Sequence, residues 1–266
     1  MLEKIQPKTL SEMPVQEPLK PRSSAEKRAK FFNSGNAFNM VLKPIPDAVF
    51  ELEIKTAMLS ETQTGFIDCD LADCLDNPTP ATTPFLLARY ARINNGETLE
   101  ANFNAAGSIW YVIRGDGDTT VGEQVISWSA GDLFVLPGRS EAIVKGLNGN
   151  AVLWVVTNEP QNAFENVQPA HHSESSTDFV HYPSAEIDRQ LDLLYNVEQG
   201  DDTAGIALLF SSEKQLARRN ITPTMTLAMN TLPPGDFQRS HRHNSVAITL
   251  IVQGENCYSM VDGIRK

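Results

Sequence analysis

The sequence predicts an all-β protein with a few short helices, built from two copies of a barrel of which the second is incomplete. Two observations predict this fold class. From residue 85 onward, short apolar runs recur between Gly, Pro and Asn residues, as in many short strands joined by turns. Two pairs of glycines also share one offset, because Gly96 to Gly235 and Gly115 to Gly254 each span 139 residues. The shared offset indicates an internal duplication.

Residues 1–45 are predicted to form a basic arm with a short helix. Residues 1–43 carry eight Lys and Arg against four Glu, which leaves a net charge of −15 on the remainder of a chain whose total is −11. Ser23 and Glu26 form a capping-box pattern that predicts a helix ending before Gly35. The arm is either a solvated tail or a segment that packs on the acidic body or on a neighbouring subunit.

The first barrel is predicted within residues 46–165. Its acidic residues between 47 and 78 are typical of a solvated surface, since their spacing lacks the Gly and terminal Glu of a calcium-binding loop. The strands are predicted from apolar runs that Gly, Pro or Asn residues bound. These runs cover residues 85–93, 108–114, 124–128, 133–136 and 151–156.

A connector is predicted over residues 166–222, and the start of the second barrel over 223–266. Within the connector, Ser184 precedes apolar residues at helical spacing, which predicts a helix over 184–195. His171 and His172 are adjacent, so their side chains diverge in an extended segment and are interpreted as linker histidines. Strands are expected over 205–210 and 224–229.

His241 and His243 are the candidate metal ligands. In an extended strand their side chains share one face, and two neutral imidazoles on one face suit iron, zinc, copper or nickel. The β-branched run 247–252 predicts a buried strand that Gly254 ends. The simpler alternative is a pair of histidines without a metal.

The spacing around these histidines resembles the first motif of the cupin superfamily: Gly, five residues, His-x-His, three or four residues, Glu, six residues, Gly. Gly235, His241, His243 and Gly254 occupy its fixed positions, whereas Ala247 stands where the family usually has Glu. Loss of this Glu resembles the branch of gentisate 1,2-dioxygenase and 1-hydroxy-2-naphthoate dioxygenase, whose iron is held by histidines only. The resemblance implies a bicupin made of two jelly-roll barrels, which are double-stranded β-helices.

The resemblance implies an Fe(II)-dependent ring-cleaving dioxygenase that acts on a hydroxylated aromatic carboxylate with O2. His241 and His243 would be its metal ligands, a third ligand is expected beyond the C-terminal end, and no other catalytic residue is assigned. The alternative is a small-molecule-binding cupin without catalysis, or a metal-dependent isomerase or lyase. N-terminal segments of the dioxygenase branch pack between subunits, so a homo-oligomer is expected.

The 139-residue offset predicts that the first barrel has lost its metal ligands. It aligns Asn102 with His241 and Asn104 with His243, and the family's second motif places Ala142 at its ligand position. Amides and alanine do not hold transition metals, so a metal-free first barrel is expected. The equivalent of Ala142 in the second copy falls at about position 281. The closing strands are therefore expected outside this sequence, and with two ligands the 266-residue chain itself is expected to be nearly inactive.

The composition excludes several other classes of protein. A net charge of −11 disfavours nucleic acid and anionic membranes as partners, and no apolar run reaches the roughly 18 residues of a membrane span. The N-terminus has no apolar segment typical of a secretory signal. Cys69, Cys74 and Cys257 are too scattered for a disulfide framework, so we expect free thiols in the cytoplasm.

Overall fold

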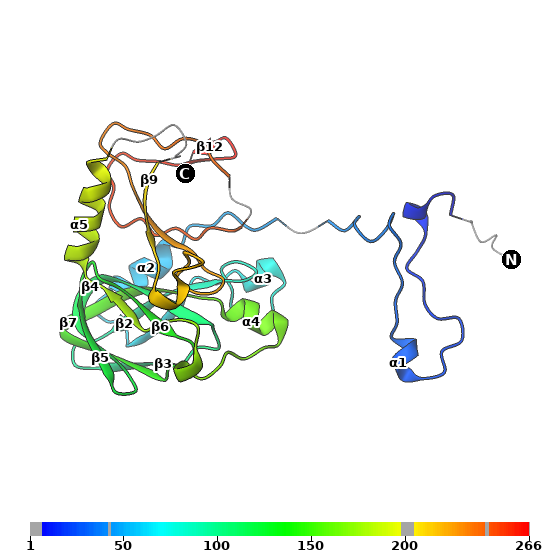
Figure 1. Ribbon diagram of the computed structural model, residues 1–266, viewed down its shortest axis with the longest axis horizontal. Helices are drawn as coiled ribbons and strands as arrows, with labels where there is room; N and C mark the ends of the chain where they lie inside the picture. The colour runs from blue at the N-terminus through cyan, green and yellow to red at the C-terminus, as the bar shows by residue number, and fades with distance from the viewer. Residues whose placement is uncertain (1–6, 42–43, 198–204, 243–244, 266) are drawn as a thin grey trace. The chain divides into compact units, whose positions relative to one another are not determined.

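The computed structural model describes residues 7–41, 44–197, 205–242 and 245–265 (Figure 1). The chain divides into two compact units, residues 1–44 and 45–266, and each is described by itself. The first unit contains η1 (Leu10–Glu12) and α1 (Ser24–Lys27). The hydroxyl of Ser23 accepts a hydrogen bond from the Glu26 amide at 3.1 Å, so the predicted helix cap is confirmed, although the helix is only one turn long.

The second unit is built on an eight-stranded antiparallel sheet, which confirms the all-β fold class. The strand order is β1-β2-β7-β4-β6-β8, with β3 paired to β7 and β5 paired to β4. The strands are β1 (Gly65–Asp68), β2 (Leu87–Ile93), β3 (Thr98–Ala101), β4 (Gly107–Val121), β5 (Gln124–Ser129), β6 (Leu133–Pro137), β7 (Ala142–Thr157) and β8 (Val180–Tyr182). Each strand predicted between residues 85 and 156 is present, but β7 begins nine residues before the predicted 151.

Two long strands, β4 and β7, fold this sheet into a barrel. They pair along most of their length, with register shifts between Val112 and Asp116, and this irregularity lets both strands bend from one layer into the other. Gly115 lies in the bend with φ of +90°, and a Cβ there would lie 2.8 Å from the backbone of Ala151. Glycine is therefore required both by the backbone conformation and by the close approach of β7.

Aromatic side chains fill the interior of the barrel. The rings of Trp110 and Phe134 stack at 5.5 Å between centroids, and Trp128 packs on the other side of Phe134 at 6.2 Å. Each indole N–H is satisfied, because Trp110 donates to Ser108 Oγ at 2.8 Å and Trp128 donates to Thr119 Oγ1 at 2.9 Å. The surrounding small and branched side chains come from β2, β3, β4, β6 and β7.

A second apolar cluster covers the outer face of the barrel. Side chains from β2, β4, β6 and β7 pack there against helices and against the chain that follows residue 205. The elements outside the barrel sheet are α2 (Glu51–Met58), α3 (Ala72–Leu75), α4 (Glu159–Glu165), η2 (His172–Glu174), α5 (Ser184–Tyr195), β9 (Ile206–Phe210), η3 (Glu213–Gln215), β10 (Leu227–Thr231), β11 (Met260–Val261) and β12 (Ile264–Arg265). The helix predicted over 184–195 is confirmed as α5.

The prediction of a buried strand over 247–252 is wrong. This segment has no regular secondary structure, and Ile251 is 69% exposed. Its alternating residues Ile248 and Leu250 instead pack against the outer cluster of the barrel. In the part of the chain that the structure describes, no strand pairs with it, and an extended apolar segment without a hydrogen-bonded neighbour does not form a sheet.

A buried carboxylate from the barrel, Asp132, holds the start of α5. Its oxygens accept hydrogen bonds from the amide of Ser184 at 2.7 Å and from that of Ser129 at 3.0 Å, and His181 Nε2 lies 3.0 Å away. Ser184 is the first residue of α5, and the preceding Pro183 provides no side-chain cap. Asp132 therefore replaces the cap that the sequence predicts at Ser184, and it binds the positive end of the helix dipole.

We expect Asp132→Asn to lower the free energy of unfolding by about 2 kcal/mol at neutral pH, because it weakens charge-assisted hydrogen bonds. Burial raises the pKa of Asp132, but the hydrogen bonds from Ser184, Ser129 and His181 outweigh burial and leave the pKa below its usual value. The carboxylate thus contributes stability above the unfolded pKa, about 3.9, and loses it as the pH falls through the folded pKa. Urea unfolding of both proteins between pH 7 and pH 3 should show the difference shrinking below about pH 4. A difference that stays constant with pH would contradict this prediction.

Candidate functional site

The predicted ligand pair follows the β9–β10 hairpin. After β10, the chain turns at Pro233, whose carbonyl accepts a hydrogen bond from the Asp236 amide at 3.1 Å, and Gly235 has a φ of +80°. His241 follows in an exposed segment without regular secondary structure. His243 lies outside the described residues, so the shared face of the two imidazoles stays a prediction.

The ring of His241 has a defined hydrogen-bond geometry. Its Nδ1 lies 3.1 Å from the backbone carbonyl oxygen of Arg239. A carbonyl only accepts, so this hydrogen bond requires a proton on Nδ1, and in a neutral imidazole with that proton Nε2 carries the lone pair. This is the tautomer of a metal-ligating histidine whose second nitrogen is oriented by a backbone carbonyl. The chemistry of His241 therefore fits a metal ion bound through Nε2.

His241 alone does not make a metal centre. Among the described residues, no three or more His, Cys, Asp and Glu side chains are grouped so that they could hold a metal ion. Stable sites for transition metals normally use three or more protein ligands. Any such site at His241 therefore depends on residues beyond those described, and no reaction step is derived through a metal here.

The structure places the two residues aligned with the metal motif on the outside of the first barrel. Asn102 and Asn104, predicted at the ligand positions, are exposed, whereas Ala101, Phe103 and Ala105 pack into the interior of the barrel. Side chains alternate between the two faces of an extended segment, so a one-residue shift exchanges the inward and outward sets. The alignment with His241 and His243 stays a prediction, because His243 lies outside the described residues.

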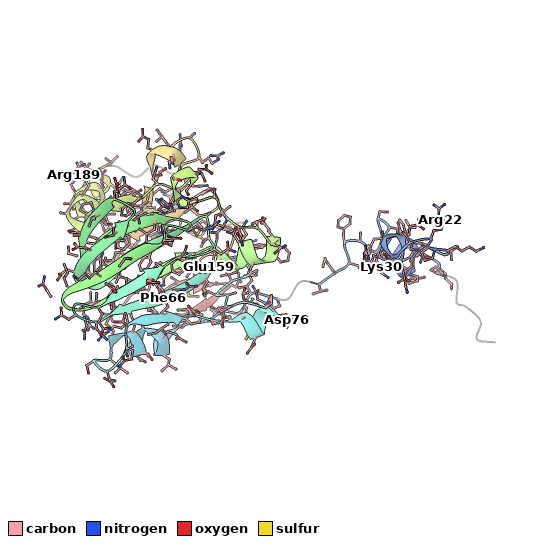
Figure 2. All side chains as sticks on the ribbon, turned by 90° about the horizontal axis from the view of Figure 1, so that it is seen from below. Arg22, Lys30, Phe66, Asp76, Glu159 and Arg189 are labelled. Carbon is pink, nitrogen blue, oxygen red and sulfur yellow. The ribbon has the colours of Figure 1, made fainter. Side chains whose placement is uncertain are left out.

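Sequence reasoning missed an ion cluster around the buried Arg89 of β2, whose two carboxylate partners are partly exposed. Arg89 Nη2 donates to Glu159 Oε2 at 2.7 Å, and Nε lies 3.0 Å from Asp68 Oδ1 without the alignment of a hydrogen bond. The guanidinium also lies over two rings, 4.7 Å from the centroid of Phe103 and 5.4 Å from that of Phe66. Phe66 and Glu159 are both labelled in Figure 2. The cluster joins β1, β2, α4 and the segment before β4.

The signal for this cluster was present in the sequence. Residues 87–93 read Leu-Ala-Arg-Tyr-Ala-Arg-Ile, and all seven are buried. Arg89 shares its face with Ala91 and Ile93, which pack in the interior of the barrel, whereas Arg92 shares its face with Ala88 and Tyr90 in the outer cluster. A charged side chain within a buried run needs a polar or charged partner. Arg89 and Arg92 therefore each predict such a partner elsewhere in the fold.

A cleft of about 270 Å³ lies beside the barrel. Its walls carry amide, hydroxyl and carboxylate groups from Asn162, Ser175 and Glu174, together with the segment 167–170. Of the two predicted metal ligands, only His241 is described, and it does not line this cleft. Among the described residues, no helix is both long enough and apolar enough to cross a membrane.

Comparison with solved structures identifies the fold. A mutant of the salicylate 1,2-dioxygenase from Pseudoaminobacter salicylatoxidans superposes with a TM-score of 0.50 and 15% identity, over 66% of this chain and 60% of that chain. The barrel has the cupin fold. At this identity the likeness establishes the fold alone, and this chain matches 60% of the length of the salicylate dioxygenase.

Two further solved structures resemble this chain. The same mutant dioxygenase in complex with gentisate has a TM-score of 0.48 and 15% identity, over 66% of this chain and 59% of that chain. The EutQ protein of Clostridium difficile has a TM-score of 0.29 and 20% identity, over 38% of this chain and 72% of that chain. No family model and no curated protein matches this chain.

Proposed function

We propose that this protein is an Fe(II)-dependent ring-cleaving dioxygenase acting on a hydroxylated aromatic carboxylate, with His241 and His243 as metal ligands. The single observation that carries the proposal is the Gly-framed His-x-His motif that follows β10 in a chain with a cupin barrel. The absence of a Glu at position 247 supports a ligand set made of histidines. The Nδ1 hydrogen bond of His241 supports metal binding through Nε2.

In this proposal the two histidines are ligands and take no part in acid–base chemistry. Iron would supply open coordination positions for the substrate and O2 and relay electrons between them. The carbonyl of Arg239 fixes the tautomer and the orientation of the His241 ring. Fixing the ring before the metal binds reduces the entropy that binding costs.

We expect His241→Ala and His243→Ala each to weaken Fe(II) binding about tenfold or more, because each removes one of few imidazole ligands. Anaerobic calorimetry with Fe(II) would measure the affinity. His171→Ala is the matched control, since His171 is exposed and lies outside the motif. Equal affinities in all four proteins would remove both histidines from the metal site.

Oxygen uptake separates the dioxygenase from the alternatives. The iron-loaded full-length protein, in which the expected third ligand is present, would be supplied with gentisate, salicylate and 1-hydroxy-2-naphthoate in turn, and oxygen consumption would be recorded with an electrode. Consumption that depends on both histidines supports the proposal. Iron binding without any consumption would instead favour a binding cupin or a metal-dependent isomerase or lyase.

A further inference from the structure

Among the described residues, the barrel sheet has four edge strands, and one of them lacks protection against pairing with another chain. β1, β3 and β8 are three or four residues long, and each contains an ionisable residue: Asp68, Glu100 and His181. β5 has six residues, Gln-Val-Ile-Ser-Trp-Ser, without a charge, a proline or a glycine. Proteins normally protect edge strands by shortness, charge or proline, and β5 has none of these features.

The backbone of β5 has hydrogen-bonding groups that point away from the barrel sheet. A two-residue turn, Gly122 and Glu123, joins β4 to β5, so the flanking pair Val121 and Gln124 is hydrogen-bonded. In an antiparallel ladder these bonds recur at every second residue. The amides and carbonyls of Gln124, Ile126 and Trp128 therefore face β4, while those at positions 125 and 127 face the free edge.

Local contacts at the end of β5 agree with this parity. The amide of Ser129 donates to Asp132 Oδ2 at 3.0 Å, and its carbonyl accepts from the Asp132 amide at 3.0 Å, so neither group is used by β4. Val125 is 59% exposed, and Ser127 and Ser129 are exposed. The side chain of His172 lies beside the turn at Gly122. The exposed residues of β5 come after this turn in the sequence.

We propose that β5 is the interface through which two copies of this chain pair edge to edge. A two-fold axis at Ile126 places Val125 of each copy opposite Ser127 of the other. Each such pair exchanges two backbone hydrogen bonds, which gives about four across the axis. Ile126 faces its own counterpart as a non-hydrogen-bonded pair, with Cα atoms about 4.5 Å apart.

The charges around β5 allow this pairing. The hydroxyl of Ser127 donates to Asp118 Oδ1 at 2.7 Å, and Asp118 is in register with Lys145 of β7. Glu123 falls opposite Ser129 of the partner, so no like charges face each other directly. A second copy fits this edge better than a charged peptide because the edge itself carries no charge to select one.

Light scattering coupled to size-exclusion chromatography is the first test, with the complete chain at several concentrations. We expect the native protein to contain a dimer and Ser127→Pro to be monomeric, because proline removes an outward N–H without disturbing the pairing to β4. Ser127→Ala is the matched control: it removes the bond to Asp118 but keeps the N–H, and it should stay dimeric. A thermal melt of the proline variant checks that the barrel remains folded.

Crosslinking tests the register. In a background with Cys74→Ser and Cys257→Ser, Ile126→Cys should form a disulfide-linked dimer on mild oxidation, because Cα atoms of a non-hydrogen-bonded pair lie within disulfide range. Val125→Cys, which faces Ser127 instead of itself, should crosslink far less. A monomeric native protein, or a dimer that survives Ser127→Pro in folded form, would overturn the proposal. Equal crosslinking at both positions would overturn the register.

Discussion

Replacing Arg89 with methionine is expected to lower the free energy of unfolding by about 3 kcal/mol. The change removes a buried cation from between the carboxylates of Asp68 and Glu159 and deletes its contacts with the rings of Phe66 and Phe103. Two carboxylates that shared one guanidinium are then left without a positive partner. Chemical denaturation with circular dichroism at pH 7 measures the loss.

Two further variants separate the charge effect from the packing effect. The triple variant Arg89→Met, Asp68→Asn, Glu159→Gln removes the uncompensated charges and should recover a large part of the stability, because neutral groups of similar size are less costly to bury. Arg189→Met is the matched surface control, since Arg189 is exposed and pairs with Glu186 on α5, and it should change stability far less than Arg89→Met. A triple variant less stable than the single one would show that the charges do not cause the loss.

Truncating Trp110 to alanine is expected to be the most damaging single change, at about 3–5 kcal/mol. Trp110 is 0% exposed, and it contacts Phe134, Phe103 and Phe66 within the barrel. Alanine leaves a large cavity and also deletes the donor to Ser108 Oγ. The measurement is the midpoint of urea unfolding together with the near-ultraviolet circular dichroism of the packed aromatic rings.

Two variants control for this truncation. Trp110→Phe keeps a ring in place and should cost less than half as much, because most of the volume remains filled. Leu216→Ala, on an exposed side chain, should have little effect. If Trp110→Ala were no more harmful than Leu216→Ala, the stacked rings would not be the centre of the barrel.

The strands could be predicted from the sequence because residues next to each strand mark where it begins and ends. Gly, Pro and Asn mark the turns, and the apolar runs between them are read directly as β2, β4, β5 and β6. The start of β7 was missed because residues 142–150 contain two glycines and two asparagines, which are turn signals. These residues form a strand because β3 and β4 pair with them, and both of these strands are distant from them in the sequence.

Other features depended on contacts that a single sequence does not contain. The run 247–252 has strong strand character, but no strand pairs with it in the part of the chain that the structure describes. Whether the side chains of Asn102 and Asn104 face the barrel interior or the outside depends on how residues 101–105 enter the barrel. The glycine offset does not specify this. His243 is not among the described residues. Its pairing with His241 and the boundaries between the four predicted segments stay predictions.

All three tryptophans of the chain, Trp110, Trp128 and Trp154, lie on β4, β5 and β7. Two of them are buried against Phe134, in surroundings that water does not reach. Their fluorescence therefore reports on the barrel, with blue-shifted emission that moves to longer wavelength when the barrel opens. The basic arm contains no indole, so its ordering or release is silent in this signal and requires an added fluorophore to be seen.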